Sequence, residues 1–412
     1  MRRRREGGPV SRDSVVIVDA VRSPIGRGRL SRGDRPGGSL SSLHPVDLLA
    51  QVLVGLVGRT GVDPSIVDDV LIGCVSQASE QAFTPARLAW LAAGMPDHVP
   101  GVTIDRRCGS GQQAVEFAAH GILAGAYDVV IAGGVESMSR VPMGSARLGA
   151  DVFGEGVQTR YAPGLIGQGV AAELVAQRYG ITRRDMDDYA VRSHARAKSA
   201  SSVMAGEIVS VIVPDGDGPR RKVTEDEVIR PETTADSLSR LKPAFADDPA
   251  AERYPDLEWG VTAGNSSQIS DGAAVLLLMS EQKAEHLGLR PRARILSTAV
   301  VGSDPLLMLT GPIPATEKAL ARAGLALADI DHVEVNEAFA SVPLAWQRHF
   351  KADGDRVNPS GGAIALGHPL GASGARLLTT MLGALEASGG RYGLQTMCEN
   401  GGMANALVIE RL

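Results

Sequence analysis

Cysteines and aromatic residues are scarce in this sequence. Only three of its 412 residues are cysteine and 4% are aromatic. An odd, small number of cysteines in a long chain argues against a disulfide framework and favours a reducing compartment, so we expect a cytoplasmic protein. With few large rings and 49 glycines, the chain is suited to helices and strands that pack closely.

A strong charge of one sign and long apolar runs are also missing. The net charge of −5 gives no electrostatic reason to expect a nucleic-acid partner. No uninterrupted apolar run is long enough to span a bilayer, so we expect no membrane span. The opening MRRRREGGP is basic but has no apolar core after it, which excludes a secretory signal.

Several common cofactor motifs are absent as well. The sequence has no Walker sequence, no GxGxxG after a strand and no CxxC pair. Nucleotide hydrolysis, dinucleotide redox chemistry and a zinc site are therefore unsupported. We expect no metal site and no permanently bound cofactor.

Apolar strands and amphipathic helices alternate along most of the chain. This alternation predicts an α/β protein with a mainly parallel sheet covered on both faces. The sequence pattern changes over 139–260. Strand signals are weak there, but helices are expected at Gly169–Tyr179 and Arg183–Ser199. We interpret this stretch as an insertion that lies over the sheet.

The order of strands and turns then starts again after a break at Gly288–Pro291. The second series follows the first faintly but in the same order, which predicts two related α/β halves; generic α/β texture is the alternative. We place the N-terminal half at 14–138 with 261–284, the insertion at 139–260 and the C-terminal half at 291–412.

The stretch DRRCGSGQQA carries the first candidate catalytic residue. Cys108 follows a short strand, and apolar residues at helical spacing predict a helix that begins near Ser110. The positive end of a helix favours a thiolate, and Gly109 and Gly111 leave room for another molecule to approach. Cys108 is therefore a candidate nucleophile, although a small buried cysteine is the alternative.

Three stretches near the C-terminus add unusual chemistry. His368 lies among glycines in GGAIALGHPLGASGAR, and Cys398 repeats the cysteine-plus-glycine pattern in MCENGG. Asn336, in NEAFA, follows a strand, where open α/β sheets bind ligands. His368 and Asn336 each have a bland alternative, a structural histidine and a helix N-cap respectively.

Two cysteines and one histidine permit a defined reaction. A thiolate attacks a carbonyl and becomes a thioester while the histidine takes its proton. A second cysteine can move a proton at the carbon next to a carbonyl, and backbone N–H groups at glycine turns stabilise the oxyanion. Together these steps describe Claisen condensation and its reverse, thiolysis.

At these residues the sequence resembles the thiolases, the family of acetyl-CoA acetyltransferases and 3-ketoacyl-CoA thiolases. The resemblance runs from Ser14 to Leu412. It implies duplicated βαβαβ halves in layered α/β/α packing with an inserted loop domain, assembled as a homodimer or homotetramer. The motifs that carry it are CGSGQQA, AGGVESMS, TAGNSSQISDGAA, NEAFA, GGAIALGHPLGASGAR and the terminal C-x-x-G-G.

The resemblance also implies roles for the candidate residues. Cys108 would be the acylated nucleophile, and His368 would activate it and help to hold the thioester oxygen. Cys398 would be the general acid and base at the α-carbon. Asn336 would fix a water that completes the first oxyanion hole, and the N–H groups of Cys108 and Asn400 would form the second.

In this family the loop domain binds coenzyme A, which is a co-substrate. By resemblance, Arg230 and Ser237 match positions near the nucleotide end of CoA, and Ser267 matches one that faces the pantetheine arm. Phe245 and Phe339 match positions that line the acyl side. The alternative for all of these is an ordinary surface or core residue.

The sequence departs from the family pattern at two places. Many members have CxGGG where this chain has Cys398-Glu399-Asn400-Gly401-Gly402, which affects the second oxyanion hole. Short-chain biosynthetic members have His-Met-Gly where this chain has Gly167-Gln168-Gly169. We expect the loss of the bulky pair to open the acyl pocket to longer or branched chains.

We therefore expect an acyltransferase of lipid metabolism: a degradative 3-ketoacyl-CoA thiolase of fatty acid β-oxidation, with acyl-CoA and CoA as its partners. Biosynthesis of acetoacetyl-CoA from two acetyl-CoA is the alternative within the family. A non-catalytic acyl-CoA-binding protein and a Cys–His hydrolase are alternatives outside this activity. A ketoacyl synthase fits less well because it uses two histidines and lacks the second cysteine.

Overall fold

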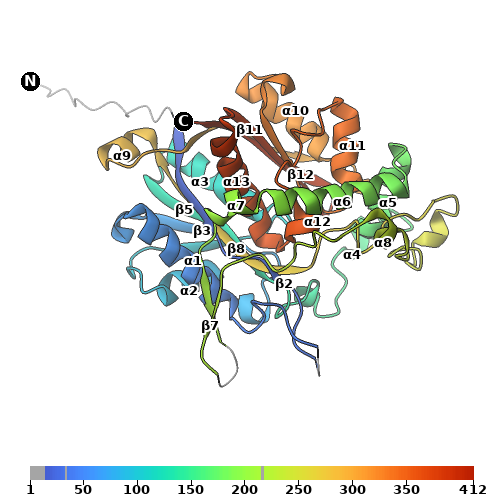
Figure 1. The fold of residues 1–412 in the computed structure, drawn as a ribbon, viewed down its shortest axis with the longest axis horizontal. Helices are drawn as coiled ribbons and strands as arrows, with labels where there is room; N and C mark the ends of the chain where they lie inside the picture. The colour runs from blue at the N-terminus through green and yellow to red at the C-terminus, as the bar shows by residue number, and fades with distance from the viewer. Residues whose placement is uncertain (1–13, 33–34, 215–217) are drawn as a thin grey trace, which may run out of the picture.

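The computed structural model describes residues 14–32, 35–214 and 218–412. Its main feature is a strongly twisted sheet of ten strands (Figure 1). In spatial order, the strands of its main path are β10 (His332–Val335), β11 (Tyr392–Glu399), β12 (Met403–Arg411), β9 (Ala293–Gly302), β1 (Val15–Arg22), β8 (Ser270–Ser280), β5 (Val129–Ser137), β3 (Asp69–Gly73) and β4 (Gly101–Ile104). The short β2 (Gly26–Arg27) pairs with β8.

The strand order repeats within this sheet. The series β1, β8, β5, β3 in one half has the same pairing as β9, β12, β11, β10 in the other. In each series the first two pairings are antiparallel and the last is parallel. The two half-sheets meet where β1 pairs with β9.

The expectation of a mainly parallel sheet is wrong. Among the strand pairs of the described residues, β3–β4, β3–β5 and β10–β11 are parallel and the other pairs of the large sheet are antiparallel. The alternation of helices and strands was misleading because β8, which follows the helices of the inserted stretch, lies antiparallel to both β1 and β5. A strand buried on both faces is continuously apolar whatever its direction.

Helices form layers on both faces of the half-sheets. Buried side chains join α1 and α2 to one face of the N-terminal half-sheet, and α10 and α11 to the outer face of the C-terminal one. Helices α3 and α13 pack against each other between the two half-sheets. The helices of the two halves are α1 (Pro45–Thr60), α2 (Pro85–Ala92), α3 (Ser110–Leu123), α9 (Glu281–His286), α10 (Pro312–Ala323), α11 (Ser341–Phe350), α12 (Ala363–Leu366) and α13 (Leu370–Ser388).

The crossing of α3 and α13 is unusually close. A Cβ atom built on Gly374 would collide with the backbone nitrogen of Gln112, and one on Gly111 would lie 2.6 Å from the carbonyl oxygen of Gly371. Side chains at these positions would force the helices apart. Cys108 precedes α3 and His368 precedes α13, so this crossing positions two of the candidate residues.

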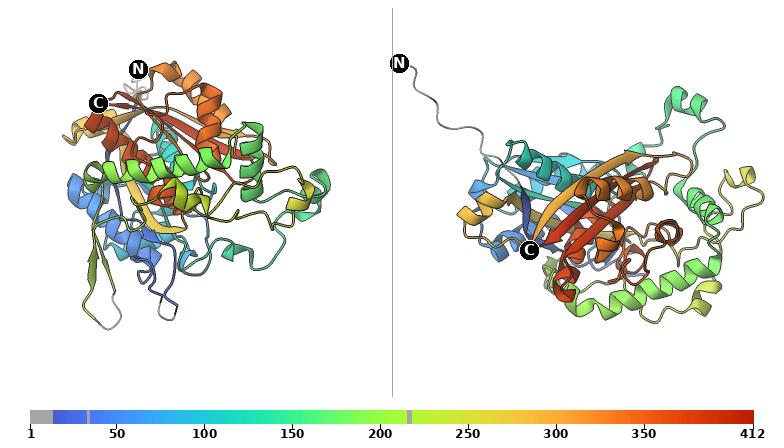
Figure 2. Two further views of the ribbon diagram at one scale, coloured as in Figure 1. Left: turned by 45° about the vertical axis from the view of Figure 1, so that its right-hand side comes forward. Right: turned by 90° about the horizontal axis from the view of Figure 1, so that it is seen from above.

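Much of the inserted stretch extends to one side of the layered body, whereas its segment 201–213 lies against helices of that body (Figures 1 and 2). Its longest helix, α6, begins with a capping box at Thr182 and confirms the helix expected there. Two buried side chains of α6, Tyr189 and Ser193, donate hydrogen bonds to the Glu337 carboxylate over 2.9 and 2.7 Å. The elements of the insertion are α4 (Gly154–Arg160), α5 (Gln168–Arg178), α6 (Arg183–Ser199), α7 (Ser201–Ala205), β6 (Val211–Val213), β7 (Arg221–Val223) and α8 (Ala235–Ser239). Among the described helices, none combines the length and apolar character that crossing a membrane requires.

Candidate active site

Cys108 lies in a tight turn directly before α3. The turn is held by Ser110, whose hydroxyl accepts a hydrogen bond from the backbone of Arg106 over 2.8 Å and donates to the carbonyl of Arg107 over 2.5 Å. Gly109 is required here because a Cβ atom would collide with the Glu399 carboxylate. The thiol itself is only 5% exposed.

This burial changes the acid–base behaviour of the nucleophile. Burial, and secondly the nearby carboxylate of Glu399, raises the pKa of the Cys108 thiol to about 12. The expectation that the helix end favours a thiolate is therefore wrong, because desolvation of the charged form outweighs the helix dipole. Cys108 needs a base to remove its proton when it reacts.

His368 can serve as such a base. Its Nδ1 lies 2.6 Å from the hydroxyl of Ser373, and that hydroxyl donates its single proton to the carbonyl of Pro369 over 2.9 Å. Nδ1 must therefore carry the ring proton, which leaves the lone pair on Nε2. Burial, and secondly Arg376, lowers the pKa of His368 to about 3, so the ring is neutral at pH 7. Nε2 is buried without a hydrogen-bond partner among the described residues.

The second cysteine lies close to the first. Cys398 is in β11 and is fully buried. Its pKa is raised well above the ordinary value by burial and then by the charge of Cys108, so the thiols are within electrostatic range of each other. Cys108 also packs in one cluster with Leu370 and Met397, which are near neighbours in sequence of His368 and Cys398. The fold thus brings these segments together.

Asn336 directly follows β10, as the sequence predicted. Its backbone N–H donates to the carbonyl of Thr396 over 3.1 Å, and both polar atoms of its amide are buried without a partner among the described residues. It is not a helix N-cap, because α11 begins at Ser341 with Ala340 as its cap. An unpartnered buried amide at this position is suited to hold a water.

Asn400 lies in the exposed turn between β11 and β12. The left-handed backbone conformations of this turn fall on Gly401 and Gly402, with φ of +91° and +76°, and not on Asn400. The departure from CxGGG therefore places no side chain in a conformation that requires glycine.

The two residues matched to the nucleotide end of CoA differ in the hydrogen bonds that their side chains already make. Arg230 is exposed, and one guanidinium nitrogen donates to Oε1 of Gln268 over 2.8 Å. Ser237 is engaged in capping α8, because its hydroxyl accepts a hydrogen bond from the backbone N–H of Thr234 over 3.1 Å. The backbone N–H of Ser267, the residue matched to the pantetheine arm, donates to the carbonyl of Ala338 over 2.9 Å.

The two residues matched to the acyl side contact each other. The ring centroids of Phe245 and Phe339 are 6.0 Å apart with an interplanar angle of 76°. A Cβ atom on Gly169 would collide with the Phe245 ring. The phenyl ring therefore fills part of the space beside Gly169, and the wider acyl pocket stays a prediction.

Sequence reasoning missed Ser373, Gln268 and Glu399, which contact or flank the candidate residues. Ser373 lies in the first turn of α13, and its motif GASGAR gave a weak signal. The side chain of Gln268 gave none, because its partners are distant in the chain. Glu399 gave a stronger signal, since a carboxylate between a candidate cysteine and glycines is unusual.

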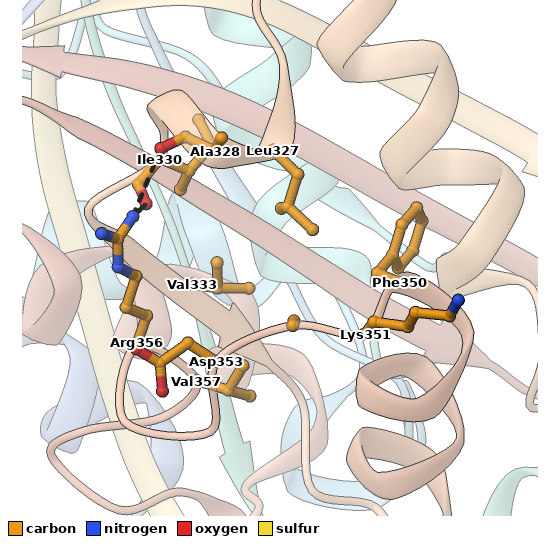
Figure 3. A pocket seen from close by; sticks show the side chains of 10 residues that line it. Leu327, Ala328, Ile330, Val333, Phe350, Lys351, Asp353, Arg356 and Val357 are labelled. Carbon is orange, nitrogen blue, oxygen red and sulfur yellow. Dashed lines mark hydrogen bonds between the residues drawn. The ribbon is translucent and has the colours of Figure 1, made fainter.

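A separate cavity of about 290 Å³ lies beside the C-terminal half of the sheet (Figure 3). Arg356 closes one side of it through hydrogen bonds to the carbonyls of Ala328 and Ile330 over 3.3 and 3.0 Å. None of the candidate catalytic or CoA-binding residues lines this cavity. Within the described ranges, no group of three or more His, Cys, Asp or Glu side chains is arranged to hold a metal ion.

Comparisons with known proteins cover nearly the whole chain. Residues 15–282 match the family model for the thiolase N-terminal domain, and residues 289–411 match that for the thiolase C-terminal domain. A steroid 3-ketoacyl-CoA thiolase of Mycobacterium tuberculosis, FadA6, is 48% identical over 97% of this chain and 94% of its own. A 3-ketoacyl-CoA thiolase of Idiomarina loihiensis is 46% identical, with 97% and 99% covered. The crystal structure of the Bacillus anthracis acetyl-CoA acetyltransferase has a TM-score of 0.85 at 39% identity, covering 97% of this chain and 99% of that one. The chain therefore belongs to the thiolase family.

Proposed function

We propose that this thiolase cleaves 3-ketoacyl-CoA with CoA to give acetyl-CoA and a shortened acyl-CoA, as a degradative enzyme of fatty acid β-oxidation. The observation that carries the proposal is that Cys108 packs against Leu370 and Met397, the near neighbours of His368 and Cys398, so that the fold gathers two buried thiols and a neutral imidazole in one region. Relatives named 3-ketoacyl-CoA thiolase and steroid 3-ketoacyl-CoA thiolase support the degradative direction over acetoacetyl-CoA synthesis.

In the first half-reaction, Nε2 of His368 takes the Cys108 proton while the sulfur attacks the 3-keto carbon. The carbon–carbon bond then breaks, and its electron pair passes to the α-carbon of the leaving acetyl-CoA. The Cys398 thiol protonates that carbon, and Cys108 keeps the shortened acyl group as a thioester. A free lone pair on Nε2 and a second thiol within electrostatic range support these assignments.

In the second half-reaction, the CoA thiol gives its proton to the Cys398 thiolate and attacks the thioester. Cys108 leaves and regains its proton from His368, so all three groups return to their starting forms. His368 and a water held by Asn336 would stabilise one oxyanion, and the N–H groups of Cys108 and Asn400 the other. The unpartnered buried amide of Asn336 supports its part.

Coenzyme A is a co-substrate in this proposal, and no permanent cofactor is needed. Arg230, Ser237 and Ser267 would contact CoA, and Phe245 and Phe339 the acyl chain. The exposed Arg230 guanidinium supports the first contact most directly, because it offers hydrogen-bond donors to phosphate. We further propose a cytoplasmic homodimer or homotetramer; all three cysteines are free thiols, which supports the reducing compartment.

Mass spectrometry after incubation with a medium-chain 3-ketoacyl-CoA tests the proposal. We expect the mass of the shortened acyl group on Cys108, its loss on addition of CoA, and no adduct in Cys108→Ser. Cys398→Ser should accept an acyl group from acyl-CoA but fail to break the carbon–carbon bond. An unmodified wild-type protein would indicate a binding protein, and release of free acid would indicate a hydrolase.

A further inference from the structure

Gln268 joins three segments that are far apart in the sequence. Its Nε2 donates to the carbonyl of Val228 over 3.0 Å and to that of Ile364 over 2.8 Å. Its Oε1 accepts a hydrogen bond from the guanidinium of Arg230 over 2.8 Å. One side chain thereby connects the loop domain with α12, the short helix directly before His368.

The backbone of Gln268 contacts the catalytic loop as well. Its carbonyl accepts a hydrogen bond from the backbone N–H of His368 over 2.9 Å, and its N–H donates to the carbonyl of Ala363 over 3.3 Å. The side chain and main chain of one residue therefore hold both ends of the stretch 363–368. This stretch ends at His368 and therefore positions the imidazole in the site.

The chemistry of an amide is what these partners require. Two carbonyls need two N–H donors and the guanidinium needs an acceptor, which are the groups that a glutamine side chain offers. A glutamate would place an oxygen against the carbonyls of Val228 and Ile364. It would also neutralise Arg230, whereas the neutral glutamine orients the guanidinium and leaves its positive charge available to an anion.

We propose that Gln268 is a positioning residue that fixes Arg230 and the His368 loop relative to each other, so that one contact supports both CoA binding and catalysis. This rests on the function proposed above, in which Arg230 meets the anionic nucleotide end of CoA and His368 is the base. When Gln268 is lost, Arg230 loses its orientation and the histidine loop loses a support that Arg230 alone does not provide.

Steady-state kinetics of the full-length protein separate these two effects. Arg230→Gln should raise KM for CoA roughly 10-fold with kcat within about twofold of wild type, since it removes one charged contact from binding. Gln268→Ala should raise KM to a similar extent and also lower kcat by roughly 10-fold, because the imidazole is misplaced. In the double variant the two KM effects should not multiply, because both act through the same guanidinium.

Gln268→Glu provides a second, independent variant in case Gln268→Ala fails to fold. It should raise KM for CoA as Arg230→Gln does, and it should also lower kcat because it repels the carbonyls that precede His368. Gln282→Ala, an exposed glutamine on α9, is the matched control and should behave as wild type. Thermal denaturation of each variant would establish that the differences arise in folded protein.

A second readout does not depend on CoA. The rate at which iodoacetamide alkylates Cys108 reports on the base beside it, and it should fall in Gln268→Ala but not in Arg230→Gln. Folded Gln268 variants with wild-type kcat, KM and alkylation rate would overturn the inference, as would KM effects that multiply in the double variant. If wild type itself fails to turn over 3-ketoacyl-CoA, the proposed function fails instead.

Discussion

The hydroxyl of Ser373 determines which nitrogen of His368 can act as a base. Its single proton is donated to the carbonyl of Pro369, so it can only accept from Nδ1. The arrangement keeps the Nε2 lone pair available for the proton of Cys108. An imidazole without this hydroxyl would populate both tautomers, one of which has no lone pair at Nε2.

Replacing Ser373 therefore tests the assigned tautomer. We expect Ser373→Ala to lower kcat roughly 10- to 100-fold with little change in KM, because only the proton-transfer step is affected. Ser388→Ala, at the exposed far end of the same helix, is the control and should have wild-type kinetics. A wild-type kcat in Ser373→Ala would contradict the assignment.

The carboxyl group of Glu399 is buried beside the nucleophile turn, and neither of its oxygens has a partner among the described residues. Burial raises its pKa from 4.5 to about 9; Arg106 opposes this rise, and Glu116 and Asp105 each add a smaller raising effect. The folded protein therefore keeps this proton over a pH range in which the unfolded chain has released it. Stability must fall as pH rises through that range.

This gives a pH-dependent prediction for Glu399→Gln. Between pH 5 and pH 7, the raised pKa of Glu399 should lower the unfolding free energy of the wild-type protein by about 3 kcal/mol, at 1.36 kcal/mol per pH unit. The variant cannot titrate there, so the slope of its unfolding free energy against pH should be less negative by about 1.4 kcal/mol per pH unit. Urea unfolding at the two pH values measures it. Glu285→Gln, an exposed residue on α9, should leave the slope unchanged.

At the scale of elements, the crossing of α3 and α13 fixes the relation between the two halves of the site. The helices approach so closely because Gly111 and Gly374 line the contact. Cys108 and His368 lie just before the N-termini of these helices, so a change in the crossing moves both groups together. The geometry of the site thus depends on residues that touch no substrate.

Gly374→Ala tests this dependence. Its Cβ would meet backbone atoms of Gln112, which cannot rotate away, so we expect a loss of about 1–3 kcal/mol in unfolding free energy and a lower kcat. Gly383→Ala lies on the same helix, where a Cβ would meet nothing closer than 3.8 Å. That control should stabilise the protein by about 0.5–1 kcal/mol. Equal effects of the two substitutions would argue against the close crossing.

One buried carboxylate takes part in attaching the inserted stretch to the C-terminal half. Glu337 accepts hydrogen bonds from Tyr189 and Ser193 of α6 and from the backbone of Ile364 over 3.1 Å. The same carboxylate thus ties α6 to the helix before His368. The attachment of α6 and the position of the loop that carries His368 therefore depend on a shared group.

Removing one of these anchors should loosen the insertion selectively. We expect Ser193→Ala to leave Glu337 one hydrogen bond short and to destabilise the protein by about 1–3 kcal/mol. Amide hydrogen exchange should increase in α6 more than in β8 or β5, which lie in the core of the sheet. Uniform exchange throughout the molecule would contradict a local role. Ser202→Ala, at an exposed position of the nearby helix α7, is a suitable control.

At the scale of the whole molecule, the sequence predicted features that depend on local pattern. The start of α3, the strand before Asn336 and the long helix α6 were correct because periodicity and capping residues determine them. The duplicated α/β fold class is also confirmed, by the structural match and by the repeated strand order. The direction of β8 was not predictable, because a buried strand has the same pattern in either orientation.

The features that were missed depend on contacts across the chain. The partners of Gln268 lie 40 and 96 residues away, and no local signal specifies such pairs. The raised pKa of Cys108 had the same origin, since the sequence suggested the helix end but not the depth of burial or the approach of Glu399. Predicting that a residue is reactive was possible, whereas predicting its protonation state required its surroundings.

The position of β12 has a consequence for biosynthesis. It follows every other described strand in chain order, yet it lies between β9 and β11 in the interior of the sheet. A ribosome-bound chain therefore cannot complete its second half-sheet until this strand has emerged. Cys108 is synthesised roughly 300 residues earlier, so it meets the segment around Cys398 only near the end of synthesis, and a prematurely terminated chain would lack a complete second half-sheet.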